Sequence, residues 1–238
     1  MLEVAKKQEE KDAFNAVEAA MSDASYKIRI LALQKIDLIN KFSKKDAISK
    51  IMQMANNDDK TLVQATAIET LGKLTDPALK TIFEKGLESK SYSVIGKSLV
   101  AMYYIDKPTA IAKSKELPDE IKKILATPLT RIYIEEKDEK ELPFIAKSVL
   151  SGMFLTGDDT TKSLYQKAFK QISESNNSEA IQNLVEDMVV KGNQYKSFNF
   201  DKVVINLMRT MINDQKTKNT ENKVRNTEII KEGMAKLL

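Results

Sequence analysis

The sequence predicts an all-α fold, an α-α superhelix built from pairs of helices, on the strength of three observations. Apolar residues recur at helical spacing along nearly all of the 238 residues. The chain holds only 7 glycines and 5 prolines, too few for a β architecture rich in turns. One pattern of apolar and small residues returns three times in the first half of the chain, which indicates stacked copies of a helical unit.

The first clear helix lies in the segment "DASYKIRILALQKI" (residues 23–36). Its periodicity places one set of apolar residues on a single face: Ile28, Leu31, Ala32, Ile36 and Ile39. Similar periodicity appears in 165–172, 181–189 and 200–212. Short polar breaks separate such segments, so we expect about eleven or twelve helices of roughly 10 to 18 residues. The best strand candidate is "TRIYIEE" (residues 130–136), but it follows a helical pattern and lacks hairpin signals.

The three copies align residue by residue. The segment at 58–71 repeats the one at 23–36 after 35 residues, and the segment at 89–102 follows after another 31. The same position holds a small residue in each copy: Ala32, Ala67 and Ser98. A small side chain there allows a neighbouring helix to approach closely, so the repeat has a structural reason.

A second helix follows each copy, in 44–55, 76–87 and 107–117. We expect Asp76 and Asp106 to cap the N-termini of two of them, each just before a proline. Helix pairs at this period are typical of an α-solenoid of the HEAT type. The alternative is a bundle of unrelated amphipathic helices. We expect one domain over 1–238, with regular helix pairs in 1–117 and a less regular helical array in 118–238.

The composition excludes several chemistries. The chain has no cysteine and no histidine, so it contains no disulfide, no thiol nucleophile, no histidine base and no histidine metal ligand. We therefore expect no catalytic residue, no bound cofactor and no metal site in this chain.

The charge and the apolar runs make two kinds of partner unfavourable. The formal charge is +4, and nearly all of the basic residues are lysines spread along the chain, whereas nucleic-acid sites favour dense clusters that include arginine. No apolar run approaches the roughly 18 to 20 residues that cross a bilayer. We expect a soluble chain that binds neither nucleic acid nor membrane, and the sequence leaves its compartment open between cytoplasm and periplasm of a bacterium.

Three segments carry a resemblance to a known family. "DASYKIRILALQKI" with its helix pairs, "NQYKSFNFDKVVINLMRTMINDQ" (residues 193–215) and "NKVRNTEIIKEGMAKLL" (residues 222–238) resemble the C-terminal helical domain of bacterial zinc aminopeptidases of the aminopeptidase N family, of the Bacteroidetes type. The resemblance covers most of the chain but rests on helical patterns and not on an invariant motif.

This resemblance implies a non-catalytic role. The family's catalytic domain carries H-E-x-x-H, a more distant glutamate ligand and a G-A-M-E-N-like segment, and this chain has none of them. Zinc is expected in the catalytic domain of the parent polypeptide. The implied partners are that catalytic domain and the peptide substrate, because such a domain encloses the active-site cavity and gates peptide access. No substrate-contact residue carries over.

The residues themselves offer few chemical candidates. Asp58-Asp59 and Asp158-Asp159 are paired carboxylates at expected helix starts, where capping is the favoured interpretation. Tyr103 and Tyr104 line a groove or, more simply, pack between repeats. The run 135–141 ("EEKDEKE") is expected to be a solvated loop and 214–226 an exposed connection. The methionines expected to fill core gaps are Met52, Met54, Met153, Met188, Met208 and Met211.

Two functional hypotheses remain. The first is the aminopeptidase C-terminal domain, which predicts an exposed apolar patch near the N-terminal end, where further domains would dock. The second is an independent HEAT-like scaffold that binds a protein or peptide on its concave face. It predicts an apolar or single-sign patch at equivalent repeat positions.

Overall fold

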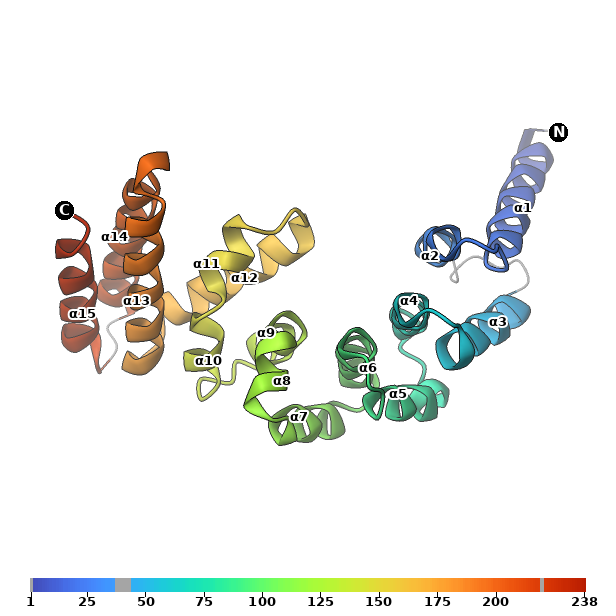
Figure 1. The fold of residues 1–238 in the computed structure, drawn as a ribbon, viewed down its shortest axis with the longest axis horizontal. Coiled ribbons are helices and arrows are strands. Elements are labelled where there is room, and N and C mark those ends of the chain that lie inside the picture. The colour runs from blue at the N-terminus through green and yellow to red at the C-terminus, as the bar shows by residue number, and fades with distance from the viewer. Residues whose placement is uncertain (1, 37–43, 219–220) are drawn as a thin grey trace. The chain divides into compact units, whose positions relative to one another are not determined.

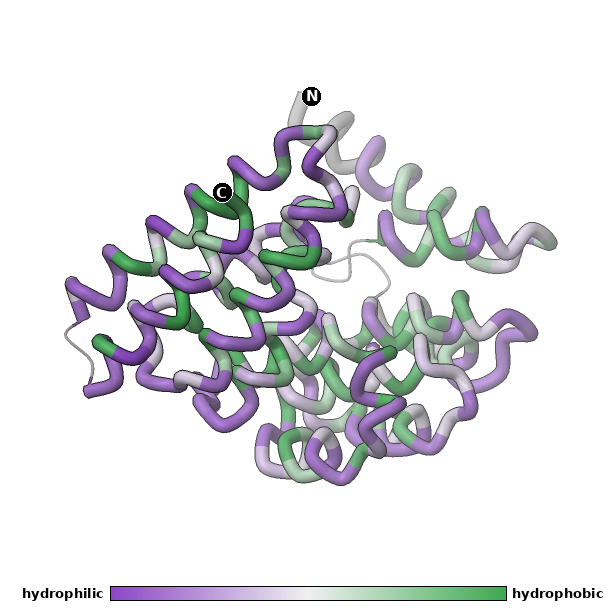
Figure 2. Tube along the Cα trace, turned by 60° about the vertical axis from the view of Figure 1, so that its left-hand side comes forward, coloured by the Kyte–Doolittle hydropathy of each residue, from purple (hydrophilic) through white to green (hydrophobic). Residues whose placement is uncertain are grey.

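The computed structural model describes the backbone of residues 2–36, 44–218 and 221–238, and over these ranges the chain is helical without a strand. The predicted fold class, an all-α fold of HEAT-like helical pairs, is confirmed. Fifteen α-helices are present in the described ranges, more than the eleven or twelve expected, because short helices such as α8 and α10 count separately. Hydrophobic and hydrophilic residues are interspersed along the helices (Figure 2).

The contacts within the chain divide it into two compact units, residues 1–128 and 129–238. The boundary falls inside α9, about ten residues after the point at which the sequence repeat fades. That the two units act as a single domain stays a prediction. Each unit is described by itself below.

The first unit holds the repeats (Figure 1). Its helices are α1 (Leu2–Ala20), α2 (Tyr26–Lys35), α3 (Lys44–Asn57), α4 (Thr61–Gly72), the 3-10 turn η1 (Pro77–Leu79), α5 (Lys80–Leu87), α6 (Tyr92–Ile105), α7 (Lys107–Glu116), α8 (Asp119–Ile124) and the start of α9 (Ala126–Glu135). The helices α2, α4 and α6 lie side by side in one row, while α3 and α5 pack behind α4 and α6. The copies found in the sequence are therefore the three helices of this row.

Two of the aligned positions are buried in all three copies. Leu33, Ile68 and Leu99 are almost completely buried, and so are the small residues Ala32, Ala67 and Ser98. A Cβ built on Gly86 of α5 would lie 3.0 Å from the Ser98 Cβ, and one built on Gly72 of α4 would lie 2.9 Å from the Ala101 Cβ. The prediction that small residues bring neighbouring helices close together is confirmed for α6.

The predicted caps also form. The Asp76 side chain accepts from the Ala78 N–H at the start of η1, and Asp106 accepts from the Thr109 N–H at the start of α7. In both places the following proline stands where no intrahelical N–H is needed. The strand candidate at 130–136 is instead part of α9 and its C-terminal end, in agreement with its helical pattern.

One predicted face is wrong in part. Ile28 and Leu31 were expected to be buried with Ala32 and Ile36, but both are exposed, while Leu33 is fully buried. α2 packs on α4 and on α1, and it does so through Leu33 and its buried neighbours, while the side that carries Ile28 and Leu31 stays largely in solvent. Ile39 lies outside the described residues.

The second unit contains the remaining helices: the rest of α9, α10 (Leu142–Ala146), α11 (Val149–Phe154), α12 (Asp159–Ser173), α13 (Ser178–Gln194), the 3-10 turn η2 (Lys196–Phe198), α14 (Phe200–Lys218) and α15 (Lys223–Ala235). α13, α14 and α15 pack on one another, and α10 and α12 pack against this group. Of the methionines expected in the core, Met54, Met188, Met208 and Met211 are buried, whereas Met52 and Met153 are half-buried.

The stretch 214–226 is largely exposed over its described residues, as expected, but it is a connection over only part of its length and two of its residues are buried. α14 continues to Lys218 and α15 begins at Lys223, and both Gln215 and Asn226 are fully buried. Gln215 Nε2 donates to the carbonyl oxygens of Ser173 (2.7 Å) and Ser175 (2.9 Å), and Asn226 Nδ2 donates to Gln215 Oε1 (3.0 Å). The polar composition reflects a buried network, because these amides satisfy carbonyls at the end of α12.

Candidate functional site

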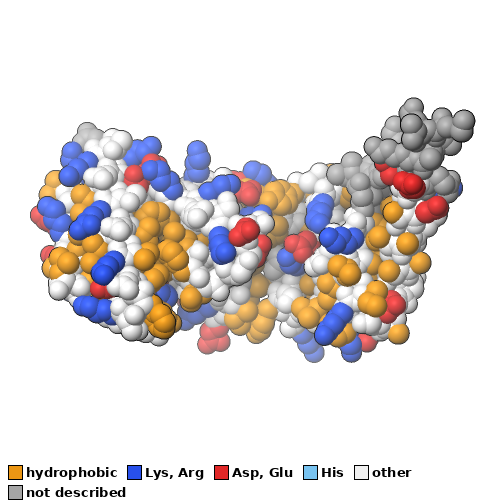
Figure 3. Space-filling model, turned by 90° about the horizontal axis from the view of Figure 1, so that it is seen from above, with side chains coloured by type: hydrophobic (Ala, Val, Ile, Leu, Met, Phe, Trp, Pro, Cys, Tyr) orange, Lys and Arg blue, Asp and Glu red, His pale blue; other side chains and the backbone are white. Residues whose placement is uncertain are grey.

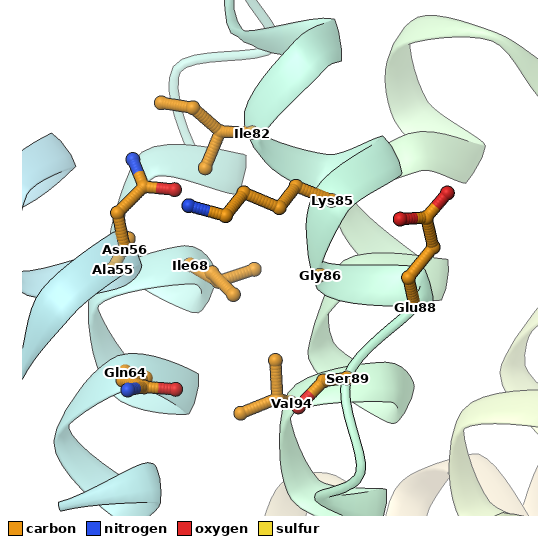
Figure 4. A pocket seen from close by; sticks show the side chains of 10 residues that line it. All are labelled: Ala55, Asn56, Gln64, Ile68, Ile82, Lys85, Gly86, Glu88, Ser89 and Val94. Carbon is orange, nitrogen blue, oxygen red and sulfur yellow. The ribbon is translucent and has the colours of Figure 1, made fainter.

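A pocket of about 300 Å³ lies between α3, α4, α5 and α6 of the first unit (Figure 4). Its apolar wall comes from Ile68, Ile82 and Val94, and its polar groups come from α3, α4, α5 and the segment directly after α5. They are Asn56, Gln64, Lys85, Glu88 and Ser89. The pocket therefore combines an apolar surface with hydrogen-bonding groups, as small-ligand and side-chain sites do.

The two amides of the pocket are held in place by the backbone. Asn56 Nδ2 donates to the Met52 carbonyl at 3.0 Å, and Gln64 Nε2 donates to the Asp58 carbonyl at 2.6 Å. These bonds fix which end of each amide faces the backbone. Figure 4 shows both amide oxygens turned toward the pocket, where they can accept hydrogen bonds.

Lys85 provides the positive charge of the pocket. Its side chain extends across the opening toward Asn56, while Glu88 lies on the opposite side (Figure 4). Lys85 makes no ion pair with any side chain in the described part of the chain, unlike Lys80 and Lys97 nearby. The arrangement can bind a polar group.

Arg29 joins the first two repeats and was missed by the sequence analysis. Its Nε donates to Asp58 Oδ2 at 2.8 Å, and its Nη2 donates to Asp58 Oδ1 and to Asp59 Oδ1, each at 2.7 Å. The hydrogen bonds that Arg29 donates to Asp58 raise the pKa of Arg29, and the hydrogen bond from the Lys60 ammonium lowers the pKa of Asp59. A signal existed in the sequence, because Arg29 is one of only four arginines and stands one residue after an aligned position.

The capping interpretation holds in part for Asp58, whose Oδ1 accepts from the Lys60 N–H at 3.0 Å just before α4, and it is wrong for Asp59. α4 begins after Lys60 without a side-chain cap, and the two carboxylates are used in the pairs with Arg29 and Lys60. It is confirmed for Asp158, which accepts from the N–H groups of Thr160 and Thr161 at the start of α12. The Thr161 hydroxyl also donates to this carboxylate and lowers the pKa of Asp158. Asp159 is almost fully exposed in the first turn.

A second charged cluster joins α5 to α7. Lys80 Nζ donates to Asp106 Oδ2 at 2.7 Å, and Thr109 Oγ1 donates to the same oxygen at 2.8 Å. These bonds hold the pKa of Asp106 at about 2, and the bond from Lys80 has the largest effect. Next to it, Tyr103 is buried and Tyr104 is exposed, with their rings 5.4 Å apart. Tyr103 therefore packs between helices, and Lys107 Nζ lies 5.0 Å from the centre of its ring.

The N-terminal edge of the row exposes an apolar surface. Ile28 on α2 is 42% exposed, although the aligned residues Val63 and Val94 are 0% and 2% exposed. Leu31, one turn further along α2, is exposed as well. α4 and α6 therefore bury this position, whereas α2, which packs on α1 and α4, leaves it partly in solvent.

The second unit carries an exposed aromatic cluster. Phe200 at the start of α14 packs edge-to-face with Phe154 at the end of α11 (centroids 5.2 Å apart) and with Tyr195 (6.1 Å). Phe198 in η2 is 80% exposed and Leu155 after α11 is 67% exposed. Figure 3 shows hydrophobic side chains gathered on this face of the second unit. The sequence signal was present but unused, since "YKSFNF" (residues 195–200) contains three aromatic residues in six.

The remaining candidates have structural roles or none. Residues 135–141 form the mostly exposed end of α9 and its following loop, as expected. Across the residues that the structure describes, no three acidic side chains gather closely enough to hold a metal ion. Within the same part of the chain, no helix has the length and apolar character needed to cross a membrane.

Comparison with known proteins supports the repeat architecture. The family model of HEAT repeats matches residues 15–102, which run from α1 to α6. The match covers the three aligned copies and ends where the row of equivalent helices ends. No curated protein matches the sequence.

Proposed function

We propose that this chain is the non-catalytic helical domain of a zinc-dependent aminopeptidase, where it encloses the active-site cavity and limits the access of peptides. HEAT-like repeats form a scaffold, and scaffolds of this kind work by binding. The zinc would be held by the catalytic domain of the same polypeptide, since this chain has no histidine and no cysteine.

The observation that carries the proposal is the apolar edge at α2. Ile28 and Leu31 leave an exposed apolar surface on α2, although Val63 and Val94 at the positions equivalent to Ile28 are buried. A catalytic domain packed against α2 would bury them in the way that Val63 and Val94 are buried. The patch lies near the N-terminal end of the chain, where the aminopeptidase hypothesis places it.

The first test is the reading frame upstream of the Met1 codon in the source genome. We expect it to continue into a segment that contains H-E-x-x-H several hundred residues before Asp23. A stop codon and a promoter directly before Met1 would refute the proposal.

A second test uses the full-length enzyme and asks whether the edge is an internal interface. Ile28→Glu is expected to loosen the packing of the helical domain and to increase cleavage of long peptides relative to short ones, because the cavity opens. Val224→Glu on α15, which changes another exposed apolar residue, is the control. An unchanged ratio of long to short substrates in Ile28→Glu would argue against a gate that docks through α2.

The second candidate is an independent scaffold that binds a peptide, and the pocket between α3 and α6 favours it. The fixed amides of Asn56 and Gln64, with the ammonium of Lys85, can match the donors and acceptors of a peptide segment. If the upstream frame stops, pull-down with the wild-type chain and with Lys85→Glu would separate partners that use this pocket from those that do not.

A further inference from the structure

We propose that the aromatic cluster of the second unit is a docking surface for an acidic protein segment that carries apolar anchor side chains. The cluster consists of Phe154, Leu155, Tyr195, Phe198 and Phe200. It lies where the end of α11 meets the turn between α13 and α14. This surface is separate from the α2 edge and the pocket, which both belong to the first unit.

The cluster has a fixed base and an exposed tip. The edge-to-face contacts of Phe200 with Phe154 and Tyr195 hold three rings together. Asn199, which follows Phe198, has a left-handed backbone (φ 58°) and connects η2 directly to α14. The chain therefore presents Phe198 at a short, defined turn, with most of its ring in solvent.

Aromatic residues in such a setting have a known energetic role. A few aromatic anchors carry most of the binding energy at protein interfaces, and isolated exposed apolar residues do not need a partner whereas clusters often have one. Here Phe154 packs on Phe200, and the exposed Leu155 directly follows Phe154, so the cluster joins two elements that are far apart in the sequence.

The charges beside the cluster define the partner. No acidic residue occurs between Asp187 and Asp201, and Asp201 itself is buried. Lys191 pairs with Asp187, but Lys196 makes no ion pair with any described side chain, and Lys202 Nζ donates to the amide oxygen of Asn199 at 2.8 Å. Near Leu155, Asp158 accepts from the N–H groups of Thr160 and Thr161, and Asp159 pairs with Lys162. Lys196 and Lys202 have no carboxylate partner among the described residues, and they favour a segment whose apolar side chains lie between acidic ones.

A membrane surface is less well matched. Binding to anionic lipid through charge takes a cluster of roughly four to eight basic residues, and this surface offers two. A protein partner needs fewer charges, because they orient the complex while the aromatic anchors supply the affinity.

The test measures binding to the purified chain by fluorescence anisotropy. The probe is a labelled amphipathic peptide with phenylalanine and leucine on one face and glutamate on the other, and its control has lysine in place of glutamate. We expect the acidic probe to bind and the basic one not to bind. Phe198→Ser is expected to weaken binding about tenfold or more. Lys196→Glu is expected to weaken it mainly at low salt.

Val224→Ser is the matched control, because it removes an apolar side chain of similar exposure from the same unit. Phe198 is mostly in solvent, so circular dichroism should show equal thermal unfolding for all variants. Equal binding of both peptides, or unchanged binding in Phe198→Ser, would overturn the proposal.

Two further outcomes would overturn the proposal and assign the surface to a different partner. Binding to phosphatidylserine vesicles that Phe198→Ser abolishes, without binding to the acidic peptide, would assign the surface to lipid. Dimerisation in sedimentation that Phe198→Ser abolishes would assign it to a second copy of the chain. Neither outcome depends on the upstream reading frame, so this inference fails or stands separately from the proposed function.

Discussion

At the residue scale, Asp106 shows how one carboxylate can stabilise the connection between three helices. It ends α6, caps α7 and binds Lys80 of α5. Because the folded pKa of about 2 lies below the ordinary value of about 3.9, the charged form is favoured in the folded state. Its contribution to stability is complete above about pH 4 and is lost as the pH falls toward about 2.

We therefore expect Asp106→Asn to lower the midpoint of thermal unfolding near pH 6, and the difference from wild type to shrink between about pH 4 and pH 2. Asparagine retains an oxygen that can cap α7, so the variant tests the charge. Circular dichroism melts across this pH range provide the measurement. A difference that stays constant with pH would mean that the pair with Lys80 contributes nothing.

Gln215 is the clearest example of a buried polar residue with a defined role. Its side chain satisfies two carbonyls and also accepts from Asn226. We expect Gln215→Leu to lower the free energy of unfolding by about 1–3 kcal/mol, because buried hydrogen-bonding groups lose their partners. Urea denaturation measures this, with Lys216→Leu as the exposed control on the same helix. Equal losses in the two variants would contradict the role of the network.

At the element scale, the row of α2, α4 and α6 was predictable because each copy repeats the same buried positions. The exposure of Ile28 could not be predicted, since the periodicity of one helix does not reveal which of its faces the neighbouring helices cover. Gln215 was misjudged for a related reason. A polar residue in a polar stretch gives no sign of the carbonyls that it satisfies in another helix.

Close helix contacts in the second unit also depend on glycine. A Cβ on Gly152 of α11 would lie only 1.9 Å from Cδ2 of Tyr165 on α12, whereas one on Gly157 would meet nothing within 4 Å. Gly152→Ala should therefore push α11 and α12 apart and destabilise the protein by about 1–3 kcal/mol, despite the better helix propensity of alanine. Gly157→Ala should be nearly neutral. Denaturation of both variants measures the change in the free energy of unfolding. An unchanged value for Gly152→Ala would show that the tyrosine ring can move aside.

At the scale of the whole molecule, the two units define how stability is distributed. Most contacts are made within residues 1–128 or within 129–238. We expect Gly152→Ala to increase amide hydrogen exchange in α11 to α15 and to leave α3 to α6 unchanged. Gly86→Ala, which brings a Cβ against Ser98, should do the reverse. Exchange followed by mass spectrometry resolves this, and a uniform increase over both units would show that they unfold together.

The candidate surfaces were less accessible to sequence reasoning than the fold. The amides of Asn56 and Gln64 belong to different helices, and only packing brings them to one pocket with Lys85. The aromatic cluster had a local signal in "YKSFNF", but Phe154 joins it from 41 residues before Tyr195. Contacts between distant segments of this kind follow from the tertiary structure and not from the periodicity of either segment.

The exposed Ile28 position of α2 has a consequence for the ancestry of the chain. Since α2 exposes at this position an apolar residue that α4 and α6 bury, a tandem duplication of the gene segment that encodes one helix pair would supply a helix able to cover it. Repeat number could then change in single genetic steps without redesign of an interface. Homologous genes are expected to differ by whole helix pairs inserted beside α2 more often than by insertions within them.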